Sequence, residues 1–163
     1  MKEAELKVIR QKMRQSVLLW FSFLLSLFGI ATLVEWLRRG ADTLLPIQNR
    51  ALHTDLLFVA VACFITMGIA RYFLLKIPAE KPDWGIEILT GRLFLTAVIS
   101  LGLAEVICLI GLVEYLCLHN SDSFYLFFTM AMLGVILHIP RYSAWRSYLE
   151  QMTGNTLPPE IGG

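Results

Sequence analysis

The sequence predicts an all-α integral membrane protein, a bundle of four transmembrane helices. Of the 163 residues, 56% are hydrophobic and only 17% are charged, whereas a typical soluble domain is about a quarter charged. The mean hydropathy is +0.63. Four apolar stretches are each long enough to cross a hydrocarbon core of ~30 Å as a helix. None of them alternates like a barrel strand, and a helix satisfies its own backbone hydrogen bonds inside lipid.

The four predicted spans cover about residues 16–37, 55–76, 92–117 and 123–139. The first continues into Glu35 and Trp36 without a small-residue cleavage site, so we expect a retained helix rather than a signal peptide. The short connection at 119–122 predicts that the third and fourth spans form an antiparallel hairpin. We expect residues 1–152 to form a single domain and residues 153–163 to form a flexible tail.

Basic residues predict the orientation. Eleven of the fourteen Lys and Arg residues fall in the N-terminal segment (five), around the second connection (four) and in the C-terminal segment (two). These regions share one side of a four-pass protein, and the opposite side holds only Arg38, Arg39 and Arg50. The positive-inside rule therefore places both termini in the cytoplasm, and we expect a bacterial inner membrane. The net charge of +1 offers no basic field for nucleic acid.

Two segments predict amphipathic helices on the cytoplasmic side. Residues 1–14 place Leu6, Ile9 and Met13 on one face. Pro140 should break the fourth helix, and the segment after it carries an apolar stripe that begins at Tyr142 and ends near Gly154. Such faces suit the membrane surface or a partner subunit, and residues 1–14 equally fit a solvated extension of the first span. We also predict anchoring positions at the membrane interface for Trp36, Tyr115, Tyr142, Trp145 and Arg146.

Glu105 is the most informative residue of the sequence because it lies near the midpoint of the third span. An acid at the bilayer centre costs ~2.5–3.5 kcal/mol on insertion scales. We therefore expect Glu105 to be protonated or hydrogen-bonded inside the bundle. Its predicted neighbours are Ser22 and Ser26 on the first span, Thr66 on the second, and Gly102 and Cys108 on its own helix.

The third span also carries small residues at helical spacing. Ser100, Ala104, Cys108 and Gly111 recur at i, i+4, i+8 and i+11. Small residues let helices approach closely in lipid. We expect this stripe to face another helix.

Residues 104–113 read Ala-Glu-Val-Ile-Cys-Leu-Ile-Gly-Leu-Val. This segment resembles the carboxylate helix of the ATP synthase c subunit, the membrane proteolipid, which places a Glu or Asp six residues before Gly-Leu-Val. The resemblance implies reversible binding of H⁺ or Na⁺ at Glu105. The chain also resembles uncharacterised bacterial four-helix membrane proteins with such a segment and a Pro-Arg after the last helix, here Pro140-Arg141.

Three functional hypotheses follow from these features. We expect a non-catalytic structural or accessory subunit that packs with other membrane subunits or with copies of itself, in which Glu105 specifies helix packing. The first alternative is a proteolipid-like subunit that translocates H⁺ or Na⁺ through Glu105. The second is a redox subunit that binds haem or quinone, with His53 and His119 on the same predicted side. We expect no cofactor other than lipid, because three cysteines without metal-type spacing favour neither a zinc site nor a disulfide framework.

Overall fold

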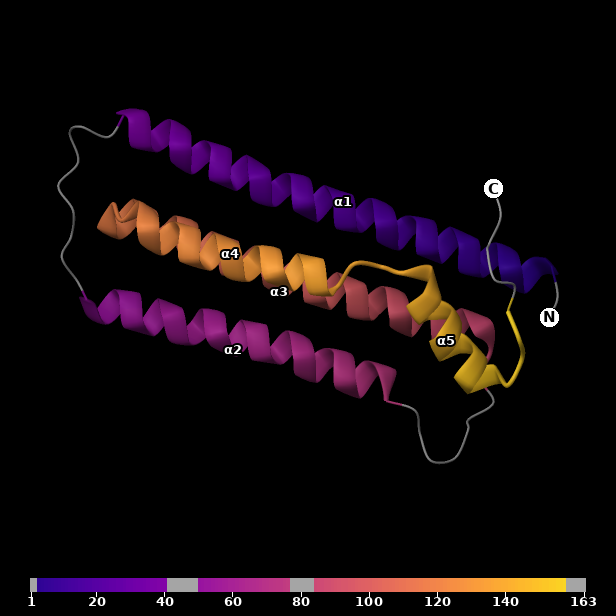
Figure 1. Ribbon diagram of the computed structural model, residues 1–163. Coiled ribbons are helices and arrows are strands. Elements are labelled where there is room, and N and C mark those ends of the chain that lie inside the picture. Colours follow the sequence, from indigo (N-terminus) through magenta and orange to yellow (C-terminus); the bar gives the residue numbers. More distant parts are fainter. Residues whose placement is uncertain (1–2, 41–49, 77–83, 158–163) are drawn as a thin grey trace.

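A computed structural model describes residues 3–40, 50–76 and 84–157, and every regular element in these ranges is a helix (Figure 1). The helices are α1 (Glu3–Gly40), α2 (Arg50–Leu75), α3 (Ile86–Leu118), α4 (Ser121–Leu137) and α5 (Tyr142–Thr153). The all-α prediction is confirmed for these residues. Residues 41–49 and 77–83, in the first and second predicted connections, and the end of the predicted tail lie outside the described residues.

Helix α3 is the centre of the fold. It packs against α1, α2 and α4, and α1 and α2 lie on opposite sides of the α3–α4 pair (Figure 1). Three helices, α1, α2 and α3, are long and apolar enough to cross a membrane. Helix α4 has 17 residues, which is about 26 Å; it meets the same test only together with α5, and the two helices are bent by 53°. Three to four helices therefore have the dimensions of membrane spans.

The small-residue stripe of α3 allows the close contact with α4. Ser100, Ala104, Cys108 and Gly111 are all buried. A Cβ atom placed on Gly111 would lie 2.7 Å from the Cβ atom of Phe127 in α4. The prediction that this stripe faces another helix is confirmed, because small side chains let two helix backbones approach closely.

The turn between α3 and α4 is short, as predicted. His119 ends α3 in the left-handed region with φ 53°, and its N–H donates to the Tyr115 carbonyl oxygen. The side chain of Asn120 then accepts from the N–H groups of Asp122 and Ser123, which caps α4. At its other end, α4 stops before Pro140, and α5 begins two residues after that proline. The predicted helix break is also confirmed.

The helices extend further than predicted. Helix α1 is continuous from Glu3 through the predicted first span, and α3 begins at Ile86, so residues 86–91 are helical rather than part of a connection. The predicted third span began only at residue 92 because Glu87, Thr90 and Gly91 interrupt the apolar stretch before it. The extensions reach beyond the end of α4 and meet α5 there (Figure 1).

Apolar residues of the two amphipathic segments meet in one buried cluster together with the beginning of α3. Ile9 of α1, Leu89 and Leu93 of α3, and Trp145 and Leu149 of α5 belong to one buried cluster. Each of these helices has an apolar face, and mutual burial removes all three faces from water at once.

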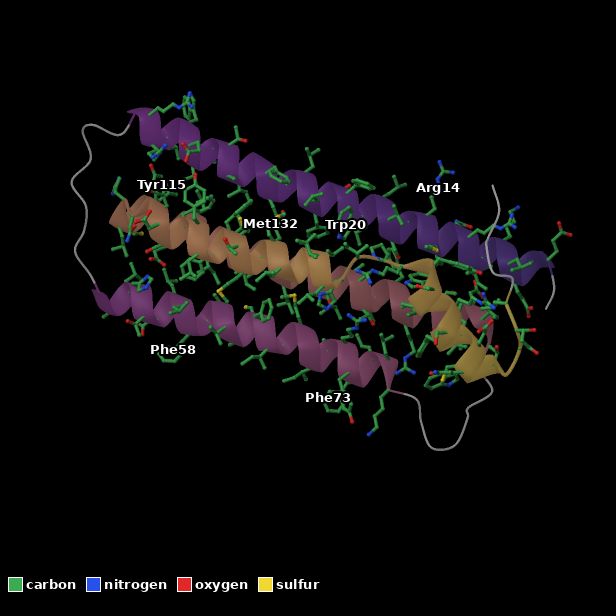
Figure 2. The ribbon with its side chains drawn as sticks, viewed as in Figure 1. Arg14, Trp20, Phe58, Phe73, Tyr115 and Met132 are labelled. Atoms are coloured by element: carbon green, nitrogen blue, oxygen red, sulfur yellow. The ribbon has the colours of Figure 1, made fainter. Side chains whose placement is uncertain are left out.

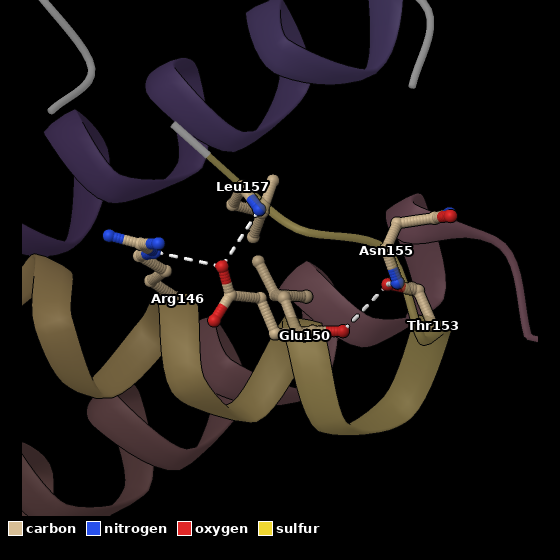
Figure 3. A network of polar contacts seen from close by, with 6 residues as sticks. Arg146, Glu150, Thr153, Asn155 and Leu157 are labelled. Atoms are coloured by element: carbon tan, nitrogen blue, oxygen red, sulfur yellow. Dashed lines mark hydrogen bonds and ion pairs between the residues drawn. The ribbon is translucent and has the colours of Figure 1, made fainter. Parts of the chain in front are cut away.

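The chain after α5 is held in place as far as Leu157. Gly154 ends α5 with φ 71°, as predicted. Leu157 is buried, and its N–H donates to Oε1 of Glu150, which also accepts from Nε of Arg146, each at 2.8 Å (Figure 3). These bonds, that from Arg146 first, lower the pKa of the Glu150 carboxyl. Within the predicted tail, Leu157 therefore packs against the protein, and residues 158–163 lie outside the described part.

Candidate functional site

Glu105 lies where α1 and α3 meet. The Ser26 hydroxyl of α1 donates to Oε1 of Glu105 at 2.5 Å. Cys108, one turn further along α3, is buried, whereas Glu105 itself is only half-buried. The predicted mid-span carboxylate thus has one donor from a neighbouring helix and remains in part at the surface of the described helices.

The other predicted neighbours do not supply donors to Glu105. Ser22 donates to the Leu18 carbonyl oxygen of its own helix. Thr66 is exposed on α2 and donates to the Ala62 carbonyl oxygen at 2.7 Å. The prediction that Thr66 neighbours Glu105 is therefore corrected: a hydroxyl on a helix finds an acceptor four residues back without any partner helix. Gly102 lies one turn before Glu105, and a Cβ atom there would meet no atom within 4 Å.

An exposed apolar strip runs along α3 beside Glu105. Its side chains are between 42% and 52% exposed, and it consists of Leu95, Val106, Leu109, Val113 and Leu116. Helix α4 covers a different side of α3, where the small-residue stripe lies. Glu105 therefore adjoins an apolar face that no described helix covers.

A second carboxylate, Glu114, was not predicted as a site residue. It is completely buried, and His53 Nδ1 of α2 lies 2.5 Å from its Oε1, while Oε2 is buried without a hydrogen-bond partner. Nine residues separate Glu114 from Glu105, which is about 900° of helical rotation at 100° per residue, or opposite faces. One acid of α3 thus faces α1 and the other faces α2. The sequence did carry a signal for Glu114: this acid directly follows the apolar run of the third span, on the side of the protein where His53 was predicted.

A third carboxylate joins α1 to α4. Tyr125 of α4 donates to Oε1 of Glu35, and Arg38 pairs with Oε2 of the same carboxylate at 2.9 Å. Near the other end of α4, the Val135 carbonyl oxygen accepts from the indole N–H of Trp20, which lies about halfway along α1, at 2.9 Å. The Tyr125 and Trp20 contacts each join α1 to α4 through polar atoms within otherwise apolar surfaces.

The predicted interface anchors divide into two groups. Trp36 is 70% exposed, and Tyr142 and Arg146 are half-buried. Tyr115 and Trp145 are 3% and 5% exposed, so they are buried within the bundle and their anchoring role stays a prediction. Both are part of buried clusters because the helices around them bring apolar faces onto their rings.

The histidines proposed as haem ligands have separate surroundings. His53 is engaged by Glu114. His119 ends α3, its Nδ1 is buried without a partner, and its ring lies 6.2 Å from that of Tyr115. Within the described ranges, no group of three or more His, Cys, Asp or Glu side chains is arranged to hold a metal ion. The three cysteines are free thiols.

The fold and these contacts define a helical protein with three to four helices of membrane-spanning dimensions, joined by carboxylates on α1 and α3. No protein-family model matches the chain, and comparisons with curated proteins and with solved structures find no match.

Proposed function

We propose that the protein is a four-pass protein of a bacterial inner membrane, and that it acts as a non-catalytic structural or accessory subunit. It packs through α3 against another membrane subunit or a second copy. The observation that carries this proposal is the half-buried Glu105 beside the exposed apolar strip of α3.

The surface composition supports the membrane placement. Large apolar side chains point outward from α2, among them Phe58 and Phe73, which are 71% and 65% exposed (Figure 2). The exposed hydroxyls of Thr32, Thr66 and Thr129 each donate to a carbonyl oxygen four residues earlier. These three threonines therefore present no unsatisfied hydroxyl donor to lipid.

The arrangement of the helix ends supports the proposed orientation. The beginning of α1, the end of α2, the beginning of α3 and helix α5 lie at one end of the protein (Figure 1). Most of the basic residues belong to these segments. The positive-inside rule then assigns this end to the cytoplasm.

Glu105 favours an assembly over a solitary bundle. A carboxyl group at mid-span is costly where lipid reaches it, and the Ser26 bond occupies only one side of the group. A partner helix on the strip of Val106 and Leu109 would cover the rest of Glu105 and bury apolar side chains at the same time. Helices in lipid associate through such packing and polar contacts.

Site-specific photo-crosslinking in intact membranes tests this proposal. A photoreactive amino acid at Leu109 should form a protein adduct of one defined mass, whereas the same amino acid at Phe58, on the outer side of α2, should not. Glu105→Ala should reduce the Leu109 adduct several-fold, and Glu35→Ala, which removes a carboxylate between α1 and α4, should not. Equal adducts at both positions, or a monomer by native mass spectrometry at every detergent strength, would contradict the proposal.

Ion translocation through Glu105 is the second candidate. The Ser26 hydroxyl bond to this carboxyl group supports it, since a neutral donor leaves the charge of a carboxylate free to bind a cation. Carbodiimide labelling followed by peptide mass spectrometry tests it. Labelling of Glu105 that Na⁺ or high pH suppresses would support translocation, and Glu105→Gln should abolish the label. An unreactive Glu105, with the protein intact, would exclude it.

A further inference from the structure

A small cavity lies where α4 bends into α5, beside the end of α2 and the first half of α3. Its volume is about 120 Å³, well below the ~300–1,000 Å³ of sites that enclose drug-sized ligands. Leu75, Leu93, Ala97 and Ile139 give it apolar walls. The cavity has the size for a headgroup or a small ion rather than for a whole cofactor.

The polar lining of this cavity is cationic. Arg71 and Arg141 both line it, and no Asp or Glu does. Arg71 is held beside the end of α4 because its Nη1 donates to the Leu137 carbonyl oxygen at 3.3 Å. Arg141 forms no ion pair with any residue of the described ranges. The one nearby arginine on α5, Arg146, is already neutralised by Glu150.

The first turn of α5 adds a partial positive charge. Pro140, Arg141 and Ala144 line the cavity, and α5 begins there without a side-chain cap. The N-terminal end of a helix carries about half a positive charge and directs N–H groups outward. Both the arginines and the helix therefore favour an anion at this place.

Two residues that line this cavity each have a buried polar atom without a hydrogen-bond partner. Tyr148 is only 8% exposed and lines the cavity, yet its hydroxyl makes no hydrogen bond. Burial raises the pKa of this hydroxyl, so it remains a donor. His138 Nδ1 is bonded to the Gly134 carbonyl oxygen, which leaves the neutral ring with Nε2 as an acceptor; Nε2 is buried and unpartnered. An unmet donor and an unmet acceptor on residues that line one cavity suit an anion that carries a hydroxyl group.

We propose that this cavity binds the phosphate group of an anionic ligand, with Arg71, Arg141 and Tyr148 as donors. A glycerol-type hydroxyl next to the phosphate would donate to His138 Nε2. The expected source is a phospholipid headgroup such as that of phosphatidylglycerol, because the cavity lies at the end of the apolar part of α2 and α4. Only this choice of source rests on the membrane placement proposed above; the site itself rests on the cavity and its lining.

Native mass spectrometry of the full chain in detergent tests the proposal. Phosphatidylglycerol, phosphatidylcholine, glycerol 3-phosphate and inorganic phosphate are each titrated against the purified protein. We expect phosphatidylglycerol to bind about tenfold more tightly than phosphatidylcholine. Tyr148→Phe removes only the hydroxyl, and Arg141→Gln removes one charge; both should weaken binding. Arg39→Gln, the same charge change at the end of α1 that lies away from α5, is the matched control and should leave binding unchanged.

The outcomes distinguish whether the cavity binds a phosphate group from whether that group belongs to a lipid or to a soluble ligand. If the soluble phosphates bind and the same two variants weaken them, while lipids show no headgroup preference, the phosphate site stands and its ligand is soluble. If neither Tyr148→Phe nor Arg141→Gln changes the affinity for any of the four probes, the site is overturned. Because Tyr148→Phe keeps the ring, its thermal unfolding should match that of the unaltered protein without ligand.

Discussion

Gly111 of α3 lies directly against Phe127 of α4, so that an added Cβ atom would stand 2.7 Å from the Cβ and 3.3 Å from the Cγ of that phenylalanine. Both phenylalanine atoms are close to the backbone and cannot move aside without shifting α4. The glycine is therefore explained by helix packing, whatever Glu105 does six residues earlier.

Gly111→Ala should destabilise the protein by about 1–3 kcal/mol, the usual cost of overpacking. Gly102→Ala is the matched control on the same helix, because its Cβ would meet nothing within 4 Å; it should be neutral or slightly stabilising. Thermal unfolding in detergent can be followed with a thiol-reactive dye through the buried Cys108, after Cys63 and Cys117 are replaced by Ala. Equal effects of the two substitutions would contradict the close contact.

Ser26→Ala should cost about 1–2 kcal/mol, because it removes the donor of an inter-helix hydrogen bond to a carboxyl group. Ser22→Ala, one turn earlier, should have almost no effect, since that hydroxyl serves only its own helix. The same dye assay compares the two variants. If neither substitution changes the thermal stability, the hydrogen bond from Ser26 to Glu105 does not stabilise the protein in detergent.

His53→Ala should destabilise the protein by about 1–3 kcal/mol, because it leaves the buried Glu114 without its partner. Adding Glu114→Leu to that variant should recover most of the loss, since an apolar side chain needs no partner there. The double-mutant cycle measures the coupling of the two residues. Additive effects would mean that the pair carries no interaction free energy.

Acid should loosen the attachment of the chain after α5. The Arg146 bond and the Leu157 N–H lower the pKa of Glu150 below its ordinary value of 4.5. The folded protein therefore holds this proton less tightly than the unfolded chain does. The resulting stabilisation is complete above about pH 4.5 and is lost as the pH falls through the lower folded-state pKa.

Amide hydrogen exchange at Leu157 measures this effect. Its protection should fall below about pH 4.5, after correction for intrinsic exchange, and Glu150→Gln should remove that dependence. The amide of His119, bonded to the Tyr115 carbonyl oxygen at the far end of α3, is the internal control. Parallel loss of protection at both amides would indicate global unfolding instead.

Several features of the fold follow from the sequence alone. Apolar length predicted the helices, Pro140 predicted the break between α4 and α5, and the spacing of Ala104, Cys108 and Gly111 predicted a close helix contact. These features are local: each depends on backbone geometry or side-chain size within one segment. Ser26 was likewise named from its depth along the first span, and it is the donor that reaches Glu105.

Only the tertiary structure decided which side chains meet. Depth and helical spacing suggested Thr66 as well as Ser26, yet α2 turns Thr66 outward and brings His53 to Glu114 instead. The same holds for Trp145, a predicted interface anchor that is buried in a cluster with residues of α1 and α3. The physical reason is that an apolar side chain facing lipid and one facing another helix have the same chemistry. The sequence therefore determined where the apolar part of each helix lies, and only packing determined which faces the helices share.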